Sequence, residues 1–136
     1  MAVTIDIGDP TTVHPRDKQD VGHRLALVAR GVAYGEPIEY SGPLFRMQSQ
    51  QGHAIRIWFD HSNGLVAKDG ALKGFEIAGA DKTFLPADAR IDGKNVVVSN
   101  MEIADPVFVR YSWSDNPDGN LYNEAGLPAS PFQSGK

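Results

Sequence analysis

The chain of 136 residues contains no cysteine, no long apolar run and no excess of basic residues. Because cysteine is absent, the chain has neither a disulfide framework nor a thiolate site, and its redox compartment cannot be inferred this way. No apolar stretch approaches the ~20 residues that cross a bilayer, and the first residues lack the basic start and apolar stretch of a signal peptide. Either the protein is cytoplasmic or its true N-terminus is missing, and no membrane partner is expected.

Acidic residues outnumber basic ones, 17 against 13, which gives a formal net charge of −4. Binding to nucleic acid depends on a basic surface that neutralises phosphates, so no nucleic-acid partner is expected. The hydrophobic share of 41% and the charged share of 22% are close to globular averages. The length is enough for one ordinary domain, or for part of a domain joined to a small second one.

The first 36 residues have the pattern of an α/β unit. Residues 2–7 alternate between apolar and polar side chains, which predicts a β-strand. Asp17 is a suitable N-cap, and the apolar stripe behind it predicts a helix from about Asp17 to about Ala33. The stripe consists of Val21, Leu25, Val28 and Val32. Because one strand and one helix cannot form a core alone, we expect residues 1–36 to end an α/β domain whose larger part lies outside this chain.

From residue 37 onward, short β-branched and aromatic runs alternate with turn residues. The predicted strands are Leu44–Met47, Ala54–Asp60, Gly74–Ile77, Thr83–Arg90, Asn95–Ser99 and Val107–Trp113. The dipeptides preferred by tight hairpin turns are Asn63-Gly64, Asp69-Gly70 and Asp92-Gly93. We therefore expect an antiparallel β-sandwich over residues 37–114, and a mainly β fold class.

The last segment, residues 115–136, is rich in turn-forming residues and has almost no periodicity. Its apolar anchors are Leu121, Tyr122, Leu127 and Phe132. We expect an extended tail that packs on a surface of the sandwich.

His14 is the sharpest candidate for a catalytic residue. It lies in a loop just beyond the predicted strand, between Val13 and Pro15, and open α/β sheets place catalytic groups at strand ends. Because Pro15 narrows the backbone freedom of the loop, we expect the imidazole to be held on a rigid base. A histidine with a pKa of ~6.5 can take a proton from a serine and return it to a leaving group near neutral pH. The alternative, a surface histidine without a catalytic role, is the commoner case when position is the only argument.

Two long segments resemble the sialate O-acetylesterase family, which comprises carbohydrate esterases of the SGNH-hydrolase superfamily. The first, similar to the end of the family's catalytic domain, is VTIDIGDPTTVHPRDKQDVGHRLAL. The second, similar to the family's C-terminal end, is DPVFVRYSWSDNPDGNLYNEAGLPASPF. The resemblance implies the C-terminal part of an enzyme that hydrolyses acetyl esters on sugars and that is periplasmic or extracellular.

The resemblance also implies that His14 is the general base of a serine esterase. Many SGNH enzymes have an aspartate three residues before the histidine, where this chain has Thr11, and Thr12 stands where relatives often have a carboxylate. The orienting acid is then Asp9, Asp6 or a residue outside the chain, or the enzyme works as a dyad. We favour Asp9, since a carboxylate in this loop could reach the ring.

The nucleophilic serine of this superfamily lies near the start of its catalytic domain, and no such block precedes His14. Ser62 stands in the sequence HSNG, but Asn63-Gly64 predicts a hairpin turn there. We therefore expect the serine to come from a missing N-terminal portion of the same enzyme or from a complementary chain. The chain alone would then be inactive, and the substrate would be an acetylated sugar.

The remaining histidines and the acidic loop do not indicate a metal site. His23, His53 and His61 lack partners at metal-ligand spacing. The loop over residues 115–120 contains oxygen donors but no bidentate glutamate at a loop-closing distance, so a plain turn is expected. We expect neither a metal nor a cofactor.

Four aromatic residues leave a second function open. Trp58, Trp113, Tyr111 and Tyr122 could form a platform on which sugars stack, although aromatic residues on strands more often belong to a core or a domain interface. The alternative function is a non-catalytic carbohydrate-binding or structural β-sandwich module.

Overall fold

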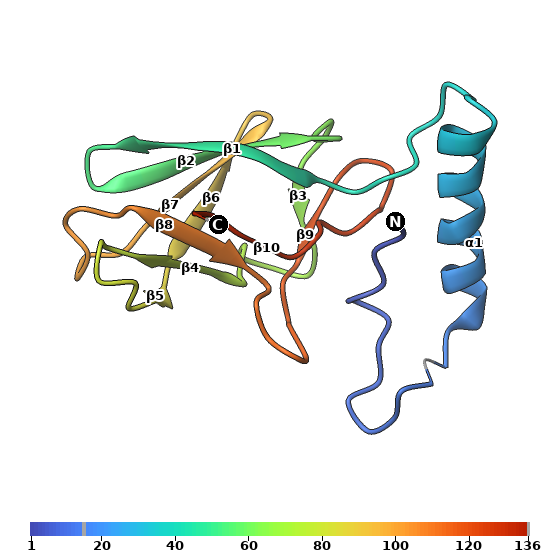
Figure 1. Cartoon of the computed structure of the whole chain (residues 1–136), viewed down its shortest axis with the longest axis horizontal. Helices are drawn as coiled ribbons and strands as arrows, with labels where there is room; N and C mark the ends of the chain where they lie inside the picture. Colours follow the sequence, from blue (N-terminus) through green and yellow to red (C-terminus); the bar gives the residue numbers. More distant parts are fainter. Residues whose placement is uncertain (15, 136) are drawn as a thin grey trace.

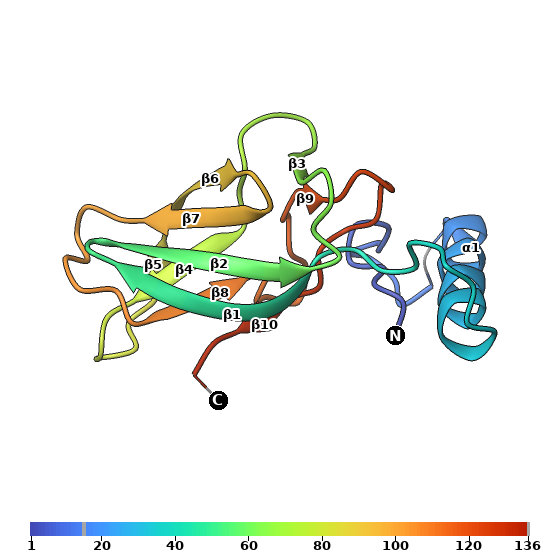
Figure 2. The same cartoon turned by 90° about the horizontal axis from the view of Figure 1, so that it is seen from above.

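The structure, a computed structural model, describes residues 1–14 and 16–135. Figure 1 shows a β-sandwich with a helix beside it, and the N-terminal segment runs between the two. Figure 2 shows the same arrangement from above. The expected fold class, mainly β with antiparallel sheets, is confirmed.

The helical part consists of α1 (Lys18–Val28), which continues into a π-helical turn, η1 (Ala29–Ala33). The strands are β1 (Leu44–Gln51), β2 (Ala54–Asp60), β3 (Val66–Ala67), β4 (Phe75–Ala78), β5 (Leu85–Pro86), β6 (Asp88–Asp92), β7 (Asn95–Ser99), β8 (Phe108–Tyr111), β9 (Leu121–Tyr122) and β10 (Phe132–Gln133). One sheet has the order β1-β2-β7-β6 and the other β10-β8-β4-β5, while β3 and β9 form a separate pair.

The core lies between the two four-stranded sheets. Strand β2 alternates as expected, because Ile55, Ile57 and Phe59 are buried while the side chains between them are only partly covered. Val96 and Val98 on the paired strand β7 are fully buried beside them. Period-two burial of this kind places one face of each strand against the opposite sheet.

The C-terminal segment contributes to this core. Phe132 on β10 stacks on Phe45 with ring centroids 4.5 Å apart and also contacts Phe59, Phe75 and Tyr111. Strand β10 pairs with β8 and so completes one sheet. The expected anchors are therefore buried, and the segment is an integral part of the sandwich rather than a surface tail.

Three local predictions are wrong. No strand forms over residues 2–7, because an apolar alternation also needs a neighbouring strand, and none of the described strands lies against it. The Asn63-Gly64 and Asp69-Gly70 turns do not close hairpins, since β3 pairs with β9. Only the turn at Asp92-Gly93 does, between β6 and β7. The single strand predicted over Thr83–Arg90 is divided into β5 and β6, which belong to different sheets.

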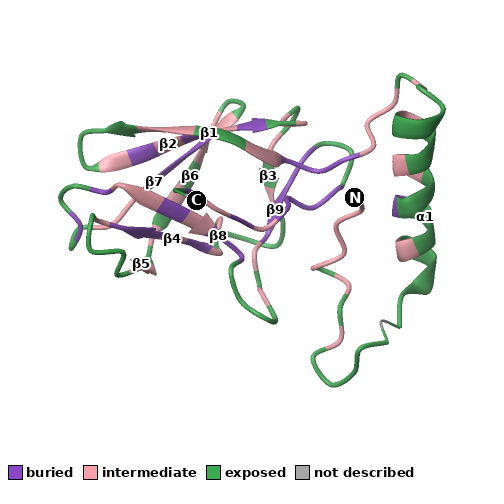
Figure 3. Ribbon diagram, viewed as in Figure 1, coloured by how far each residue is buried: buried purple, intermediate pink, exposed green. Residues whose placement is uncertain are grey.

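The predicted helix forms, and Asp17 caps it by accepting a hydrogen bond from the Asp20 main-chain N–H at 3.0 Å. Its apolar stripe is largely uncovered: Leu25 and Val32 are 55% and 64% exposed, and Figure 3 shows most of α1 in the colour of exposed residues. This exposure agrees with a covering layer outside the chain, which stays a prediction. None of the described helices is long and apolar enough to cross a membrane.

The buried residue of α1 is charged. Arg24 donates from Nη1 and Nη2 to the two carboxylate oxygens of Asp6 at 2.5 and 2.8 Å, and from Nη1 to the Val3 carbonyl oxygen at 2.8 Å. The Arg24 and Asp6 side chains are 9% and 11% exposed. Burial alone would raise the pKa of Asp6, but the hydrogen bonds and charge of Arg24 outweigh it, so the pKa is lowered. This ion pair holds the N-terminal segment on the helix.

The substitution Asp6→Asn should lower the free energy of unfolding near neutral pH by about 1.5–3 kcal/mol, the range for hydrogen bonds to charged groups. Because the folded-state pKa is lowered, the carboxylate stabilises the fold fully above its unfolded pKa of about 3.9 and loses this effect as the pH falls through the lower folded value. Urea unfolding should therefore show a difference from the variant at pH ~7 that shrinks below pH ~4.

The control is Asp60→Asn, because Asp60 forms a mostly exposed ion pair with Arg46. Its effect should stay below about 1 kcal/mol at any pH, as is usual for surface pairs. A difference for Asp6→Asn that is the same in acid as at neutral pH would contradict the proposed role of the ion pair.

Candidate functional site

The candidate site is built on residues 8–17, which we call the histidine loop. Pro15, which we expect to hold His14 on a rigid base, lies outside the described residues. Asp9 Oδ1 accepts hydrogen bonds from the main-chain N–H and the hydroxyl of Thr11, at 2.9 and 2.6 Å. The Thr12 hydroxyl accepts one from the His14 main-chain N–H at 3.2 Å. These side-chain bonds to nearby backbone are typical of tight turns. The two threonines that replace the expected carboxylates therefore shape the loop, and His14 is exposed on it.

Asp9 lies at the base of this loop as an ionised carboxylate. Thr11 donates to it from its hydroxyl and main-chain N–H, and with a smaller contribution from Arg16 these bonds hold the pKa of Asp9 below its usual value. Arg16 Nε lies 3.2 Å from Asp9 Oδ2. Within the described residues, no hydrogen bond joins Asp9 to the His14 ring. The structure thus places the two residues in one loop but does not bring their side chains into contact.

Asp6, the other carboxylate considered for this role, has a different set of partners. Both of its oxygens accept from Arg24, and Oδ2 also accepts from the Tyr122 hydroxyl at 3.1 Å. Burial, followed by the charge of Asp6 and this hydrogen bond, raises the pKa of Tyr122. Asp6 therefore has the surroundings of a structural ion pair.

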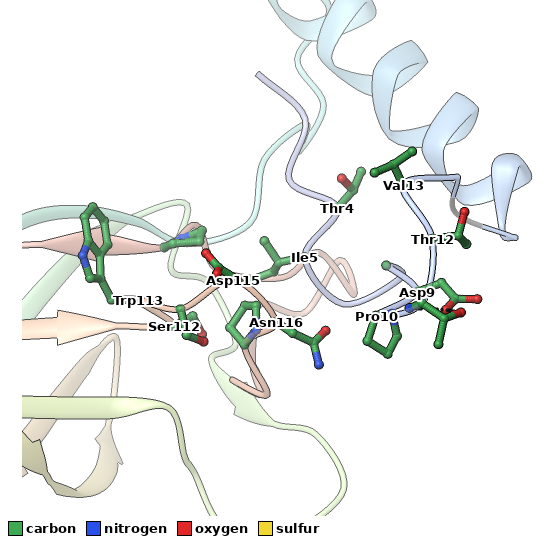
Figure 4. Close-up of a pocket in the computed structure, with 15 residues that line it drawn as sticks. Thr4, Ile5, Asp9, Pro10, Thr12, Val13, Ser112, Trp113, Asp115 and Asn116 are labelled. Carbon is green, nitrogen blue, oxygen red and sulfur yellow. Dashed lines mark hydrogen bonds between the residues drawn. The ribbon is translucent and has the colours of Figure 1, made fainter.

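An open cleft of about 920 Å³ separates the histidine loop from the sandwich. One wall consists of residues 8–13 with Thr4 and Ile5, and the other consists mainly of residues 112–117. Figure 4 shows Trp113 and Thr12 on opposite sides of this space. His14 follows directly on the last residue of the first wall, so its loop borders the cleft.

The sandwich wall is shaped by a sharp turn after β8. Ser112 adopts a left-handed backbone conformation, with φ at +49°, and its N–H donates to the Gly74 carbonyl oxygen at 2.8 Å. This turn leads the chain into Trp113, which is 41% exposed. An aromatic face of this kind, near polar side chains such as Asp115 and Asn116, is suitable for packing against a sugar ring.

The loop over residues 115–120 is held by structural contacts. Lys73 reaches Asp118 with its ammonium group at 3.0 Å and Asn120 with its main-chain N–H at 2.9 Å. The Asn120 amide in turn donates to the carbonyl oxygens of Lys68 and Ala71. These contacts agree with the expected turn. In residues 1–14 and 16–135, no three His, Asp or Glu side chains form a group that could hold a metal ion.

The other histidines lie in separate places. His23 is exposed on α1, and His53 Nδ1 lies 2.6 Å from the Ala104 carbonyl oxygen. His61 Nδ1 lies 2.5 Å from Glu39 Oε1. Ser62 follows His61 in the connection between β2 and β3; since β3 pairs with β9, the hairpin expected there does not form.

Sequence reasoning missed two features of the site. It did not find that Trp113 and its loop face the histidine loop, and it did not find the contact between Asp6 and Tyr122. Both join segments about a hundred residues or more apart, and no periodicity indicates such contacts. One signal was present: Arg24 interrupts an apolar helix segment, and a charge that becomes buried there needs an acidic partner.

No protein-family model matches the chain. Curated relatives do match it: the sialate O-acetylesterase of Mus musculus is 32% identical over 97% of this chain and 27% of its own length. The Homo sapiens sialate O-acetylesterase is 30% identical over 97% of this chain and 28% of its own length.

A solved structure is similar as well. A crystal structure of a carbohydrate acetylesterase from Xanthomonas citri has 52% sequence identity and a TM-score of 0.95, and the match covers 99% of this chain and 32% of that chain. The chain therefore spans about a third or less of the length of these relatives. By sequence the chain matches sialate O-acetylesterases, by structure it matches a carbohydrate acetylesterase, and it fits the C-terminal portion of these proteins.

Proposed function

We propose that the chain is the C-terminal part of an enzyme that hydrolyses acetyl esters on sugars, and that it supplies the general base, His14. The observation that carries this proposal is the match with a carbohydrate acetylesterase, at 52% identity over 99% of the chain. The exposed position of His14, on a loop that borders an open cleft, agrees with a role in proton transfer. The acetylated sugar and the remaining portion of the enzyme are the proposed partners.

The proposed reaction needs a serine from outside the chain. His14 accepts the serine hydroxyl proton as the oxygen attacks the acetyl carbonyl carbon, and it then gives this proton to the departing sugar oxygen. Water then repeats the cycle: His14 takes a proton from the water as its oxygen attacks the acetyl-enzyme carbonyl carbon, and it gives this proton to the serine oxygen as acetate leaves. The nucleophile comes from the N-terminal portion of the same enzyme or from a complementary chain.

Asp9 is the proposed orienting acid. It lies in the same loop as His14 and its lowered pKa keeps it ionised, which suits a group that stabilises an imidazolium. Asp6 is less suitable because both of its oxygens already accept from Arg24. To reach the ring, the Asp9 carboxylate would have to exchange contacts with Thr11 or Arg16 when the complete site forms.

His14→Ala in the complete enzyme should reduce kcat/KM by roughly 10³–10⁶-fold, as the loss of a triad member does. The measurement is hydrolysis of a chromogenic acetate, followed by release of acetate from an acetylated sugar. His23→Ala is the matched control, because it removes an imidazole from the exposed side of α1 and should leave both rates nearly unchanged. Near-normal hydrolysis by the His14 variant would refute the proposed function.

Asp9→Asn tests the orienting acid separately. Asparagine keeps an oxygen that can accept from Thr11 and so preserves the turn, but it removes the charge. If Asp9 orients His14, kcat should fall by roughly 10²–10⁴-fold, since a neutral amide no longer holds the ring in the working tautomer. The control is Asp17→Asn, which makes the same carboxylate-to-amide change at the N-cap of α1 and should leave kcat nearly unchanged. A loss below about threefold would assign the role to a residue outside the chain, or indicate a dyad.

A second function is favoured by one observation, the half-exposed Trp113 on the wall of an open cleft. In this alternative the chain is a carbohydrate-binding module and takes no part in the chemistry. Its proposed ligand would stack on the indole ring, as sugars do on aromatic side chains.

Titration of the 136-residue chain with O-acetylated xylo-oligosaccharides in a calorimeter separates the two functions. The esterase proposal predicts no saturable binding, since most substrate contacts would lie outside the chain. Saturable binding that is lost in Trp113→Ala and kept in Trp58→Ala, a control on β2, would favour the module. Co-purification of a serine-bearing partner that restores hydrolysis would indicate the complementary chain.

A further inference from the structure

A three-residue contact connects the histidine loop to the sandwich. The Asp6 carboxylate accepts from Arg24 of α1 through both oxygens, and it accepts from the Tyr122 hydroxyl of β9 through Oδ2. The Asp6 and Arg24 side chains are about nine-tenths buried, and Tyr122 is 7% exposed. We call this contact the brace. It joins Asp6 and Arg24, which are 18 residues apart in the sequence, to Tyr122, which is 116 residues from Asp6.

The brace lies at the base of the histidine loop. Asp6 precedes the start of the loop by two residues, and Arg24 lies on the helix into which the loop leads. The segments that precede and follow the loop are therefore joined to each other at the Asp6 carboxylate. The hydrogen bonds inside the loop, from Thr11 and His14, are local, so they fix its shape without fixing its place relative to the sandwich.

Tyr122 is itself held firmly by the sandwich. Its main chain pairs with Val66 of β3, and the N–H of Leu121 donates to the buried Tyr111 hydroxyl at 3.0 Å. The next residue, Asn123, donates from its amide to the carbonyl oxygens of Ser41 and His61. The position of the Tyr122 hydroxyl is thus set by the sandwich.

The brace also relates the two walls of the cleft. Trp113 belongs to the sandwich wall, whereas the wall next to His14 belongs to the N-terminal segment. The Tyr122 hydroxyl bonds one part to the other close to this space, since Tyr122, Asp6 and Gly8 line the adjoining pocket. A change in this contact would shift one wall, and His14 with it, relative to the other.

The Tyr122 hydroxyl is not needed to neutralise the ion pair. Asp6 and Arg24 satisfy each other's charges through two hydrogen bonds without it, and phenylalanine would fill the same space. The hydroxyl therefore contributes a directional hydrogen bond from the sandwich to Asp6, and it does not balance a charge.

We propose that Tyr122 is a positioning residue for the esterase reaction: through Asp6 it sets the place of the histidine loop. This inference rests on the proposed function of His14. It gives the sandwich a part in turnover that differs from sugar binding.

The test uses the complete enzyme with Tyr122→Phe. Because small misplacements of a catalytic group cost up to about 10²-fold in rate, kcat should fall by roughly 10- to 100-fold, while KM stays within about twofold. Rates are divided by the number of active sites titrated from the burst of a chromogenic acetate, which removes any loss of folded enzyme. Tyr34→Phe is the matched control, since Tyr34 is 77% exposed, and its kcat should not change.

A second measurement shows whether Tyr122 acts through His14. In an enzyme that already carries His14→Ala, the added Tyr122→Phe should not lower the residual rate further, because the group that it positions is gone. An equal loss in both backgrounds, or an unchanged kcat in the single variant, would overturn the inference.

The outcomes separate this inference from the function on which it rests. If His14→Ala is inactive and Tyr122→Phe has the kcat of the parent enzyme, only the positioning role of Tyr122 is refuted. If His14→Ala retains its activity, both proposals fall.

Discussion

The arrangement of the first 36 residues depends on one ion pair, between Asp6 and Arg24. This part of the chain contains little buried apolar surface: Leu25 and Val32 are largely exposed, and the buried residue of α1 is the arginine. A hydrophobic contact would hold the segment without fixing its direction, whereas a two-pronged arginine–carboxylate contact is directional. The charge pair therefore determines how the N-terminal segment lies on the helix, and it leaves the apolar stripe available.

The sandwich was largely predictable because burial on one face produces a period of two. Strands β2 and β7 have the predicted bounds: Ile55 and Ile57 on β2 alternate with less buried residues, whereas the three valines of β7 are all buried. The same rule failed for residues 2–7, because alternation identifies an apolar face but does not supply a neighbouring strand. The hairpin predicted at Asn63-Gly64 is wrong for another reason: a dipeptide determines a local turn but does not determine which strands pair.

The candidate site was only half predictable. His14 stands in a contiguous motif whose resemblance to an esterase family is visible in the sequence. Trp113 and Tyr122 come near the histidine loop only because β8 and β9 bring them there. Single polar contacts between remote segments produce no repeat along the chain, so a folded structure is needed to find them.

The brace offers a reason why the sandwich and the histidine loop occur together. An appended module joined by a flexible linker would take different positions in different relatives. Instead, the TM-score of 0.95 over 99% of the chain means that helix, loop and sandwich have the same relative placement in the Xanthomonas citri structure. The hydrogen bond from the Tyr122 hydroxyl to the buried Asp6 carboxylate favours this single placement, because it is directional and is lost when the two parts separate. In the proposed site, the sandwich is then a rigid support whose position relative to the loop affects the reaction.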